Sequence, residues 1–353
     1  MVVGHRILDR LPELVGYAKP PQVFIVYDRT VESLHGEAVR KYLKPSSTTI
    51  HEISVAAGER SKSARTLSRL HDFMLDRRVS RDDLVLAVGG GVISDLAGYA
   101  AATLLRGVRW GVVSTTLLGM VDAAIGGKTG INHRTGKNLI GAYWQPQFVL
   151  CDTCFLRTLT VRQRLAGWGE VAKYAGLVGG ALMARVASQR PEWLRVQDSE
   201  VLRIIRDCVA YKAHIVASDE RESGQRMLLN LGHTLGHGVE TAAGHGRFLH
   251  GEAVLLGLWA AIELSVLSGQ ARGPDLEEYR SLLRPLLAEI PRLNLSPEAV
   301  MEAVKLDKKR SGQRLRFVLL AAPGGPIITD KISEAQAVKA LQSTMRLHMQ
   351  VKG

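Results

Sequence analysis

Short apolar runs alternate with amphipathic stretches over the first 160 residues. Four runs have the length and the branched apolar content of buried strands, at 23–27, 84–88, 108–113 and 148–151. Between them, residues 63–77 and 92–105 place apolar side chains at helical spacing. Continuously apolar strands separated by helices predict a parallel sheet with helices on both faces.

The pattern changes beyond about residue 160. Long helical stretches follow, at 200–216, 227–242 and 252–267, and one strand-like run returns at 316–320 before a Pro-Gly-Gly-Pro turn signal. We therefore predict an α/β fold, with a Rossmann-like parallel-sheet nucleotide-binding domain at 1–160 and a mainly helical domain at 161–353. In such folds ligands bind beyond the carboxyl ends of the strands, so we expect the site there, facing the second domain.

Composition narrows the class of protein. The chain of 353 residues carries a net charge of +12 but only 5% aromatic residues, and its Lys and Arg residues form no basic arm. This balance disfavours nucleic-acid binding and suits a small anionic substrate drawn by the overall field. No stretch of about 18 uninterrupted apolar residues occurs, so no membrane span is expected. Three cysteines indicate a reducing compartment, and Cys151-x-x-Cys154 fits strand-end packing better than half of a zinc site.

Two glycine-rich stretches carry candidate anion chemistry. The stretch 89–95, Gly-Gly-Gly-Val-Ile-Ser-Asp, ends a predicted strand and opens a helix, where backbone can approach a phosphate. A plain tight strand-to-helix turn would use similar residues, so this signal alone is weak. The stretch 122–130 ends in Gly-Gly-Lys-Thr-Gly without Walker spacing, and Arg106, Lys137 and Asn138 lie close by in sequence. Solvated loop charges explain each of these residues singly, but phosphate or carboxylate recognition explains them together.

Histidines in the helical half are candidate metal ligands. His233 and His237 are four residues apart and share one helix face, and His245 and His250 follow. Most isolated histidines are surface or satisfied core residues, but such a pair with a third histidine and nearby carboxylates favours zinc. The spacing leaves open which imidazoles bind and which carboxylate completes the site.

Several motifs in order resemble the 3-dehydroquinate synthases of the sugar phosphate cyclase superfamily. They span 88–98, 126–141, 219–224, 229–234, 249–253 and 307–309. The chain differs from the usual family pattern at Ala57, Ser94, Arg157 and the pair Trp168-Gly169. The resemblance implies an N-terminal NAD domain, a helical metal domain and a homodimer in the cytoplasm.

The resemblance also implies the cofactors and their contacts. Zinc, replaceable by cobalt, is expected on Glu170, His233 and His250, with His237 beside the metal. NAD contacts are expected at Asp28, Glu59, Lys62, Gly91, Val92, Ile93, Ser94, Asp95, Thr115, Thr116, Phe155 and Thr158. Asp122, Lys128 and Lys137 are expected where cofactor and substrate meet.

The implied substrate is a phosphorylated sugar acid, 3-deoxy-D-arabino-heptulosonate 7-phosphate. Catalytic roles are implied for Lys128, Lys173, Lys212, Arg226, Asn230 and His237. Substrate contacts are implied at Arg106, Asp122, Asn138, Glu222 and one lysine of the Asp-Lys-Lys motif, where we favour Lys308 over Lys309. The implied sequence is oxidation at C5, loss of phosphate, re-reduction, ring opening and aldol closure to 3-dehydroquinate. Another sugar phosphate cyclase, such as an amino-dehydroquinate or valiolone-type synthase, and an NAD- and metal-dependent polyol dehydrogenase are the alternatives.

Overall fold

A computed structural model describes residues 1–43, 48–189, 199–244, 246–311 and 315–352, except for the side chains of residues 18 and 307–311. It divides into two compact units, Met1–Leu159 and Thr160–Gly353. Each unit is described by itself below.

Unit 1 is built on a parallel sheet. Its strands are β1 (Val2–Gly4), β2 (Gln22–Asp28), β3 (Thr49–Val55), β4 (Leu84–Gly89), β5 (Arg109–Ser114) and β8 (Val149–Asp152). Their order is β1-β8-β5-β4-β2-β3, and every neighbouring pair is parallel. The predicted α/β fold class is confirmed.

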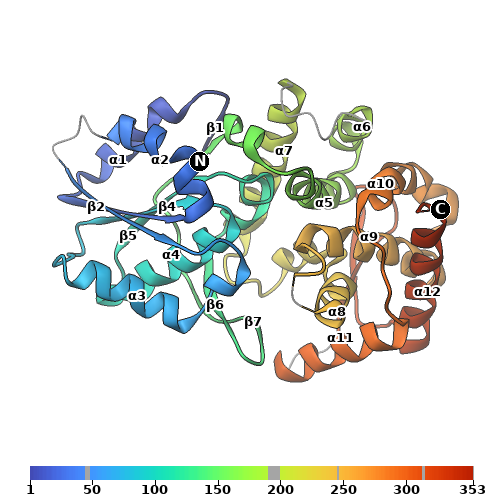
Figure 1. Cartoon of the computed structure of the whole chain (residues 1–353). Coiled ribbons are helices and arrows are strands. Elements are labelled where there is room, and N and C mark those ends of the chain that lie inside the picture. Colours follow the sequence, from blue (N-terminus) through green and yellow to red (C-terminus); the bar gives the residue numbers. More distant parts are fainter. Residues whose placement is uncertain (44–47, 190–198, 245, 312–314, 353) are drawn as a thin grey trace. The chain divides into compact units, whose positions relative to one another are not determined.

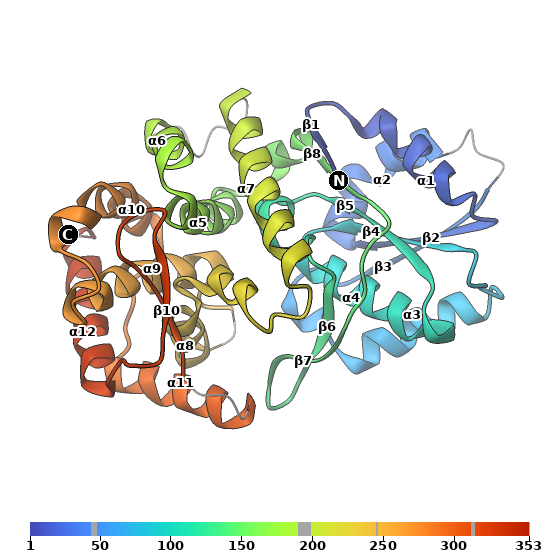
Figure 2. The same ribbon diagram turned by 180° about the vertical axis from the view of Figure 1, so that it is seen from behind.

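Helices cover both faces of this sheet because its central strands are apolar throughout. They are α1 (Leu11–Ala18), α2 (Arg29–Leu43), α3 (Ala64–Leu75) and α4 (Gly91–Thr103). Figures 1 and 2 show α1 and α2 on one side of the sheet and α3 and α4 on the other. All six side chains of β4 are buried, as expected of a strand covered twice.

Short elements complete unit 1. Four are short 3-10 helices, η1 (Leu8–Arg10), η2 (Glu59–Ser61), η3 (Leu104–Arg106) and η5 (Thr153–Thr158), and η4 (Gly119–Ala123) is a π turn. The strands β6 (Lys128–His133) and β7 (Gly136–Tyr143) form an antiparallel hairpin of their own. The sequence analysis did not predict this hairpin, which carries Lys128, Lys137 and Asn138. Its strands pair with each other and not with the main sheet, so β7 shows no alternation of buried and exposed positions.

Unit 2 is mainly helical. Its helices are α5 (Val161–Val178), α6 (Gly180–Ser188), α7 (Ser199–Ser218), α8 (His233–Ala243), α9 (His250–Leu267), α10 (Glu277–Glu289), α11 (Pro297–Ser311) and α12 (Glu334–Gln350). Two 3-10 turns, η7 (Gln225–Asn230) and η8 (Gly273–Leu276), and a hairpin of β9 (Phe317–Leu320) with β10 (Pro326–Thr329) complete it. The strand expected at 316–320 is confirmed as β9.

One expected helix is broken. We expected a continuous helix at 227–242, but the structure has η7, then a turn at Gly232, and then α8. Gly232 adopts φ +77, and a Cβ there would lie 2.9 Å from Leu258. Glycine tolerates this left-handed backbone, so the chain turns here and begins a new helix at His233.

Helix α9 is the centre of unit 2. It packs against α5, α8, α10, α12 and β9. By length and composition it is apolar enough to cross a membrane, but 78% of that window is buried inside the structure. Burial among other helices is the ordinary reason for a helix that is apolar all round.

Candidate active site

The carboxyl edge of the sheet in unit 1 has the geometry of a nucleotide site. The chain leaves β2 toward β3 on one side and returns to β4 on the other, so the strand order reverses between β2 and β4. Asp28 ends β2, and Gly89 to Gly91 join β4 to α4 at this reversal. A Cβ at Gly90 would lie 2.8 Å from Thr116, so a side chain there would fill the turn. Open sheets bind nucleotides at such points, with phosphate at the helix N-terminus.

Two of the residues expected to bind NAD, Asp28 and Ser94, make hydrogen bonds within unit 1. Asp28 caps α2 by accepting from the Val31 amide at 2.9 Å. The Ser94 hydroxyl donates to the Gly91 carbonyl at 3.0 Å and is buried. Ser94, where the chain departs from the family pattern, therefore has its hydroxyl hydrogen-bonded inside the first turn of α4.

Lys62 organises the polar residues beside this turn. Its side chain is only 3% exposed and lies 2.6 Å from the Asp95 carboxylate, and it also donates to the Asn138 side chain. Asn132 links the same group, because it donates to Glu59 at 2.8 Å and accepts from the Asn138 amide at 2.9 Å. The hairpin is thereby tied to η2 and α4. Asn132 escaped the sequence analysis, although it lies six residues before Asn138 on the paired strand.

The other expected residues of unit 1 are spread over several elements. Thr115 is 2% exposed, and its hydroxyl has no hydrogen-bond partner among the residues that the structure describes. Thr116 accepts from the Gly119 amide at 3.0 Å, beside the π turn that carries Asp122. Phe155 and Thr158 both contact His35 on α2, through an edge-on ring contact and a 2.9 Å hydrogen bond.

Arg106 lies on a backbone of unusual conformation. Leu105, Arg106 and Gly107 all have positive φ, at 51, 63 and 123. Non-glycine residues rarely adopt this region, and such turns are held in place only by their surroundings. The Trp144 ring closes against Gly107, where a Cβ would lie 2.7 Å from it. The Arg106 side chain is exposed.

In unit 2 three helices bring one carboxylate and three imidazoles together. Glu170 lies on α5, His233 and His237 on α8, and His250 begins α9. Glu170 Oε1 lies 3.5 Å from His233 Nε2 and 3.1 Å from His250 Nε2. One nitrogen of each imidazole lies within 4.8 Å of the others. The residues expected to bind zinc are thus close enough to share an ion, and geometry alone places His237 beside them as well.

Outer contacts hold these side chains in orientation. His233 Nδ1 lies 3.1 Å from the Leu231 carbonyl, which leaves Nε2 facing Glu170. His250 Nδ1 lies 3.3 Å from Glu240, a carboxylate on α8. Hydrogen bonds of this kind fix the tautomer of metal-binding histidines. The sequence analysis missed Glu240, although it follows His233 by seven residues and therefore shares its helix face.

Lys173 contacts the same carboxylate from within α5. It is 1% exposed, and its Nζ lies 2.6 Å from Glu170 Oε2. Both charges are therefore buried as a pair, with the second carboxylate oxygen directed at the histidines.

Burial and charge separate the pKa values of two histidines. Burial, together with the positive charge of Lys173, lowers the pKa of His233 to about 3. Burial also opposes the charged form of His250, but its hydrogen bonds with Glu170 and Glu240 outweigh this and raise its pKa to about 10. The protein without metal thus holds one neutral imidazole, His233, and one positively charged imidazole, His250, beside Glu170, in addition to the Lys173 ammonium. A divalent cation at this point would supply that positive charge instead.

The segment from the end of α7 through η7 carries three of the expected residues, Glu222, Arg226 and Asn230, and a residue that supports them, Asp219. Asp219 accepts from the amides of Ser223, Gly224 and Arg226, which lowers the pKa of its carboxyl to about 2. Arg226 is 2% exposed and donates to the Glu220 carbonyl. These contacts set the shape of the loop.

Glu222, in the loop before η7, contacts Asn230, the last residue of η7. The Asn230 amide donates to the Glu222 carboxylate at 2.8 Å. Lys212 is buried on α7, where it is 6% exposed. Lys308 and Lys309 belong to the part of α11 whose side chains lie outside the described residues, and His245 also lies outside the described residues.

Glycines let the helices of this site touch through their backbones. A Cβ at Gly251 would lie 1.8 Å from the Ala166 carbonyl oxygen, and one at Gly169 would lie 2.2 Å from the Gly251 oxygen. Helices α8 and α9 meet similarly, since a Cβ at Gly257 would lie 1.9 Å from the Gly232 oxygen. Each crossing therefore lies directly beside a candidate ligand: Gly169 precedes Glu170, Gly251 follows His250, and Gly232 precedes His233.

A second group of possible metal ligands, in unit 1, is a poor candidate for a metal site. His5, Asp152 and Cys154 approach one another closely enough to share an ion. However, the Asp152 carboxylate already accepts from four backbone amides, those of Arg6, Ile7, Leu8 and Cys154, which occupies the lone pairs that a metal would need.

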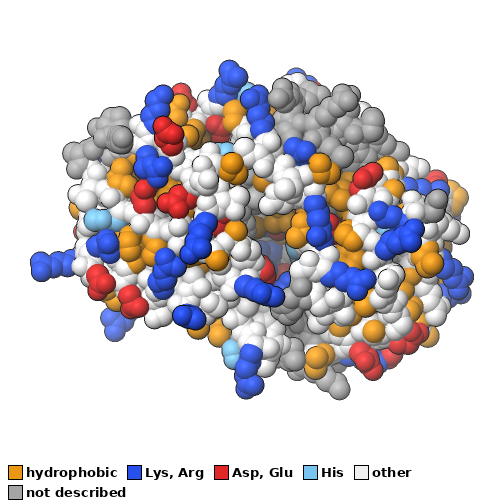
Figure 3. All heavy atoms as spheres, viewed as in Figure 1, with side chains coloured by type: hydrophobic (Ala, Val, Ile, Leu, Met, Phe, Trp, Pro, Cys, Tyr) orange, Lys and Arg blue, Asp and Glu red, His pale blue; other side chains and the backbone are white. Residues whose placement is uncertain are grey.

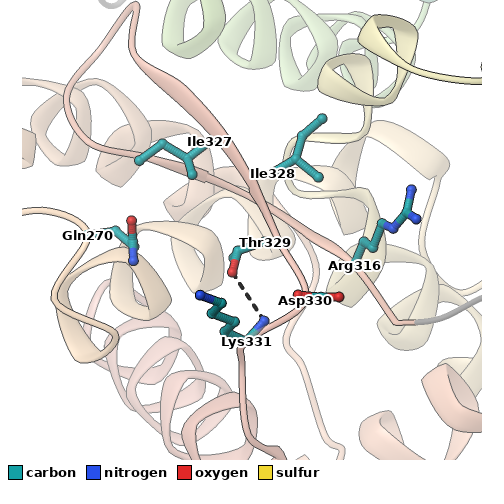
Figure 4. A pocket seen from close by; sticks show the side chains of 7 residues that line it. All are labelled: Gln270, Arg316, Ile327, Ile328, Thr329, Asp330 and Lys331. Atoms are coloured by element: carbon teal, nitrogen blue, oxygen red, sulfur yellow. Dashed lines mark hydrogen bonds between the residues drawn. The ribbon is translucent and has the colours of Figure 1, made fainter.

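A hollow of about 410 Å³ lies beside the β9–β10 hairpin (Figure 4). Its lining is Gln270, Arg316, Ile327, Ile328, Thr329, Asp330 and Lys331. It contains none of the histidines or buried lysines described above. We favour the histidine cluster as the site because chemistry depends on the side chains present and not on the size of a hollow.

Basic side chains do not form one large patch on the face shown in Figure 3. Lys and Arg residues are dispersed there among acidic and neutral ones.

Comparisons with known proteins place this geometry in a family. The model of the 3-dehydroquinate synthase N-terminal region matches residues 52–166, and the C-terminal model matches residues 167–310. The chain belongs to the 3-dehydroquinate synthase family. A 3-dehydroquinate synthase of Legionella pneumophila (strain Lens) is 41% identical over 326 residues, which is 92% of this chain and 88% of the relative.

Solved structures share the fold. ValA, a 2-epi-5-epi-valiolone synthase from Streptomyces hygroscopicus subsp. jinggangensis with NAD+ and Zn2+ bound, has a TM-score of 0.89 at 29% identity, over 98% of this chain and 96% of that one. A glycerol dehydrogenase from Schizosaccharomyces pombe has a TM-score of 0.67 at 16% identity, over 99% of this chain and 90% of that one. The second likeness concerns the fold alone.

Proposed function

We propose that this chain is a carbon–oxygen lyase that converts 3-deoxy-D-arabino-heptulosonate 7-phosphate to 3-dehydroquinate and phosphate. One observation carries this proposal: in a chain of this family, Glu170 Oε1 lies 3.5 Å from His233 Nε2 and 3.1 Å from His250 Nε2 in unit 2. The identity of 41% to a relative of that name supports this substrate over that of a valiolone synthase whose solved structure is 29% identical to this chain.

We propose NAD in unit 1 and zinc, replaceable by cobalt, in unit 2. The glycine turn between β4 and α4 fits a dinucleotide phosphate, and the Glu-His-His set fits a catalytic zinc because it leaves coordination positions for substrate. The valiolone synthase with NAD+ and Zn2+ bound supports both assignments. When bound, zinc supplies Lewis acidity toward a substrate hydroxyl, and NAD accepts and returns a hydride.

The remaining steps fall to the side chains of this chain. We assign binding of the substrate phosphate to Arg106, Lys128, Asn138 and Lys308. Lys212 and Arg226 would bind the substrate carboxylate or hydroxyls, in both cases by charge-assisted hydrogen bonds. His237 is exposed beside the cluster and would take the proton from the C5 hydroxyl. The phosphate of the substrate itself would take the C6 proton, so no further protein base is needed.

The substrate assignment is tested by product analysis. Purified enzyme with NAD and zinc is expected to release phosphate from the heptulosonate phosphate and to form 3-dehydroquinate, identified by nuclear magnetic resonance. The matched control is a sugar phosphate of similar length without the carboxylate. Faster release from that control would favour a valiolone-type synthase instead.

We also propose a cytoplasmic homodimer. The three free cysteines suit a reducing compartment, and the dimer rests on family resemblance. Light scattering is expected to give twice the chain mass of 38.5 kDa at working concentration. A single chain mass would overturn the dimer and leave the site assignments unchanged.

Metal binding is expected to release one proton near neutral pH. The raised pKa of His250, about 10, means that this imidazole is protonated at about pH 7.5 in the metal-free protein, whereas His233, at about 3, is neutral. The metal must displace the proton of His250, so apparent affinity falls roughly tenfold for each unit of pH decrease below about 10. Calorimetric titrations in two buffers of different ionisation enthalpy give the proton count. Zero protons released at about pH 7.5 would contradict the charge state assigned to His250.

A further inference from the structure

We propose that the ion pair between Arg162 and Glu252 is a positioning device for the metal site, which holds His250 at the correct distance from Glu170. Neither residue touches the histidine cluster in the described contacts. The inference rests on the proposed metal site and extends it to residues that have no assigned role.

The contacts of this pair are unusually complete. Glu252 is 0% exposed, and Arg162 Nε lies 2.7 Å from its Oε1, while Nη2 lies 2.8 Å from its Oε2. The Leu249 amide also donates to Oε2 at 2.7 Å. Arg162 Nη2 further donates to the Arg247 carbonyl. A bidentate pair fixes direction as well as distance, because both N–H groups of the planar guanidinium must be aligned.

The pair joins the two segments that carry the ligands. Arg162 lies in the first turn of α5, the helix of Glu170. Arg247, Leu249 and Glu252 surround the start of α9, where His250 lies. His250 is therefore held from both sides by residues that Arg162 bonds.

Backbone packing alone does not stop α5 and α9 from sliding or rotating against each other where they cross. The backbone contact between Gly169 and Gly251 sets how closely α5 and α9 approach, but glycines lack side chains that would resist sliding or rotation. The guanidinium supplies that resistance about two helical turns before Gly169 on α5, at a carboxylate next to Gly251. A small rotation of the start of α9 would change the 3.1 Å separation of His250 Nε2 and Glu170 Oε1, and metal ligands tolerate only a few tenths of an ångström.

The test compares Arg162→Met with Arg280→Met in the full-length protein. Arg280 also pairs with a carboxylate of α9, since its Nη2 lies 3.1 Å from Glu263, but near the other end of that helix. Zinc affinity is measured by competition with a chelator, and the geometry of the site by the visible absorption of bound cobalt. We expect Arg162→Met to weaken zinc about 10- to 100-fold, as loss of supporting contacts does elsewhere, and to shift the cobalt spectrum. Arg280→Met is expected to change affinity less than about twofold, on the same principle.

Two companion variants guard against simple misfolding. An unpaired Glu252 carboxylate in the interior would destabilise the fold, so Arg162→Met/Glu252→Gln keeps the cap on Leu249 without the buried charge. It is expected to fold and still to show the weakened metal binding. Arg162→Lys restores the positive charge without the planar guanidinium that donates to both carboxylate oxygens. It is expected to recover only part of the zinc affinity.

The outcomes separate the two proposals. Zinc affinity of Arg162→Met within about twofold of the parent, with an unchanged cobalt spectrum, would overturn the positioning role. Equal losses in Arg162→Met and Arg280→Met would overturn it too, because they would show a general loss of stability. If the parent protein itself binds neither zinc nor cobalt, the metal assignment fails, and the positioning role fails with it.

Discussion

His233→Ala is expected to lose its metal and all measurable turnover. His233 Nε2 faces Glu170 at 3.5 Å, and its pKa of about 3 keeps the imidazole neutral and ready to donate a lone pair. Removing outer supports of a metal site costs 10- to 100-fold in affinity, so removing a ligand is expected to cost more than about 100-fold. Elemental analysis after gel filtration, with phosphate release under excess zinc, measures both effects.

The matched variant is His237→Ala, which should retain metal and lose rate. Its ring lies 5.3 Å from that of His233, on the same face of α8, but its side chain is exposed. Loss of a general acid–base group typically costs 10²- to 10⁴-fold in rate. The ligand assignment would be contradicted if His237→Ala lost its metal while His233→Ala kept it.

Gly251→Ala is expected to disrupt both the fold of unit 2 and its metal site. The added Cβ would lie 1.8 Å from the Ala166 carbonyl oxygen, which is backbone and cannot rotate away. Overpacking of this kind costs about 1–3 kcal/mol, and a backbone obstacle places this variant at the upper end, at about 3 kcal/mol. Chemical denaturation measures the loss, and metal content reports the displacement of the neighbouring His250.

Gly273→Ala is the control for this substitution. Its Cβ would meet only the end of the Arg280 side chain, at 3.7 Å, in the same unit. A change of less than about 0.5 kcal/mol is expected there. Equal stability of Gly251→Ala and the parent would show that α5 and α9 do not meet backbone to backbone.

The sequence was sufficient for the elements whose signal is local. Apolar runs such as 84–88, short and rich in branched side chains, favour a covered strand, and the structure places β4 there with every side chain buried. The His233 and His237 pair was equally local, because four residues span one helical turn. Order and type of these elements therefore followed from periodicity.

The features that escaped prediction depend on contacts between distant segments. The hairpin of β6 and β7 pairs only with itself, so no alternation of buried and exposed positions marks β7, whose residues 138–141 are all exposed. The role of Gly169 depends on Gly251, more than 80 residues away in the sequence, so the departure from the family pattern at Gly169 could be noted but not explained. In the sequence, Glu240 and Glu252 cannot be told from ordinary carboxylates on helices. Only the fold brings His250 beside Glu240 and Arg162 beside Glu252.

The overall proposal has one direct test, the stoichiometry of NAD. Enzyme loaded with zinc is given the heptulosonate phosphate with NAD at about one-tenth of the substrate concentration, while phosphate and NADH are followed together. A lyase that regenerates its cofactor in each cycle is expected to release phosphate equal to the substrate added, with no net accumulation of NADH. Phosphate release that stops when NAD is used up, with NADH formed in equal amount, would contradict the proposed function and show a dehydrogenase instead.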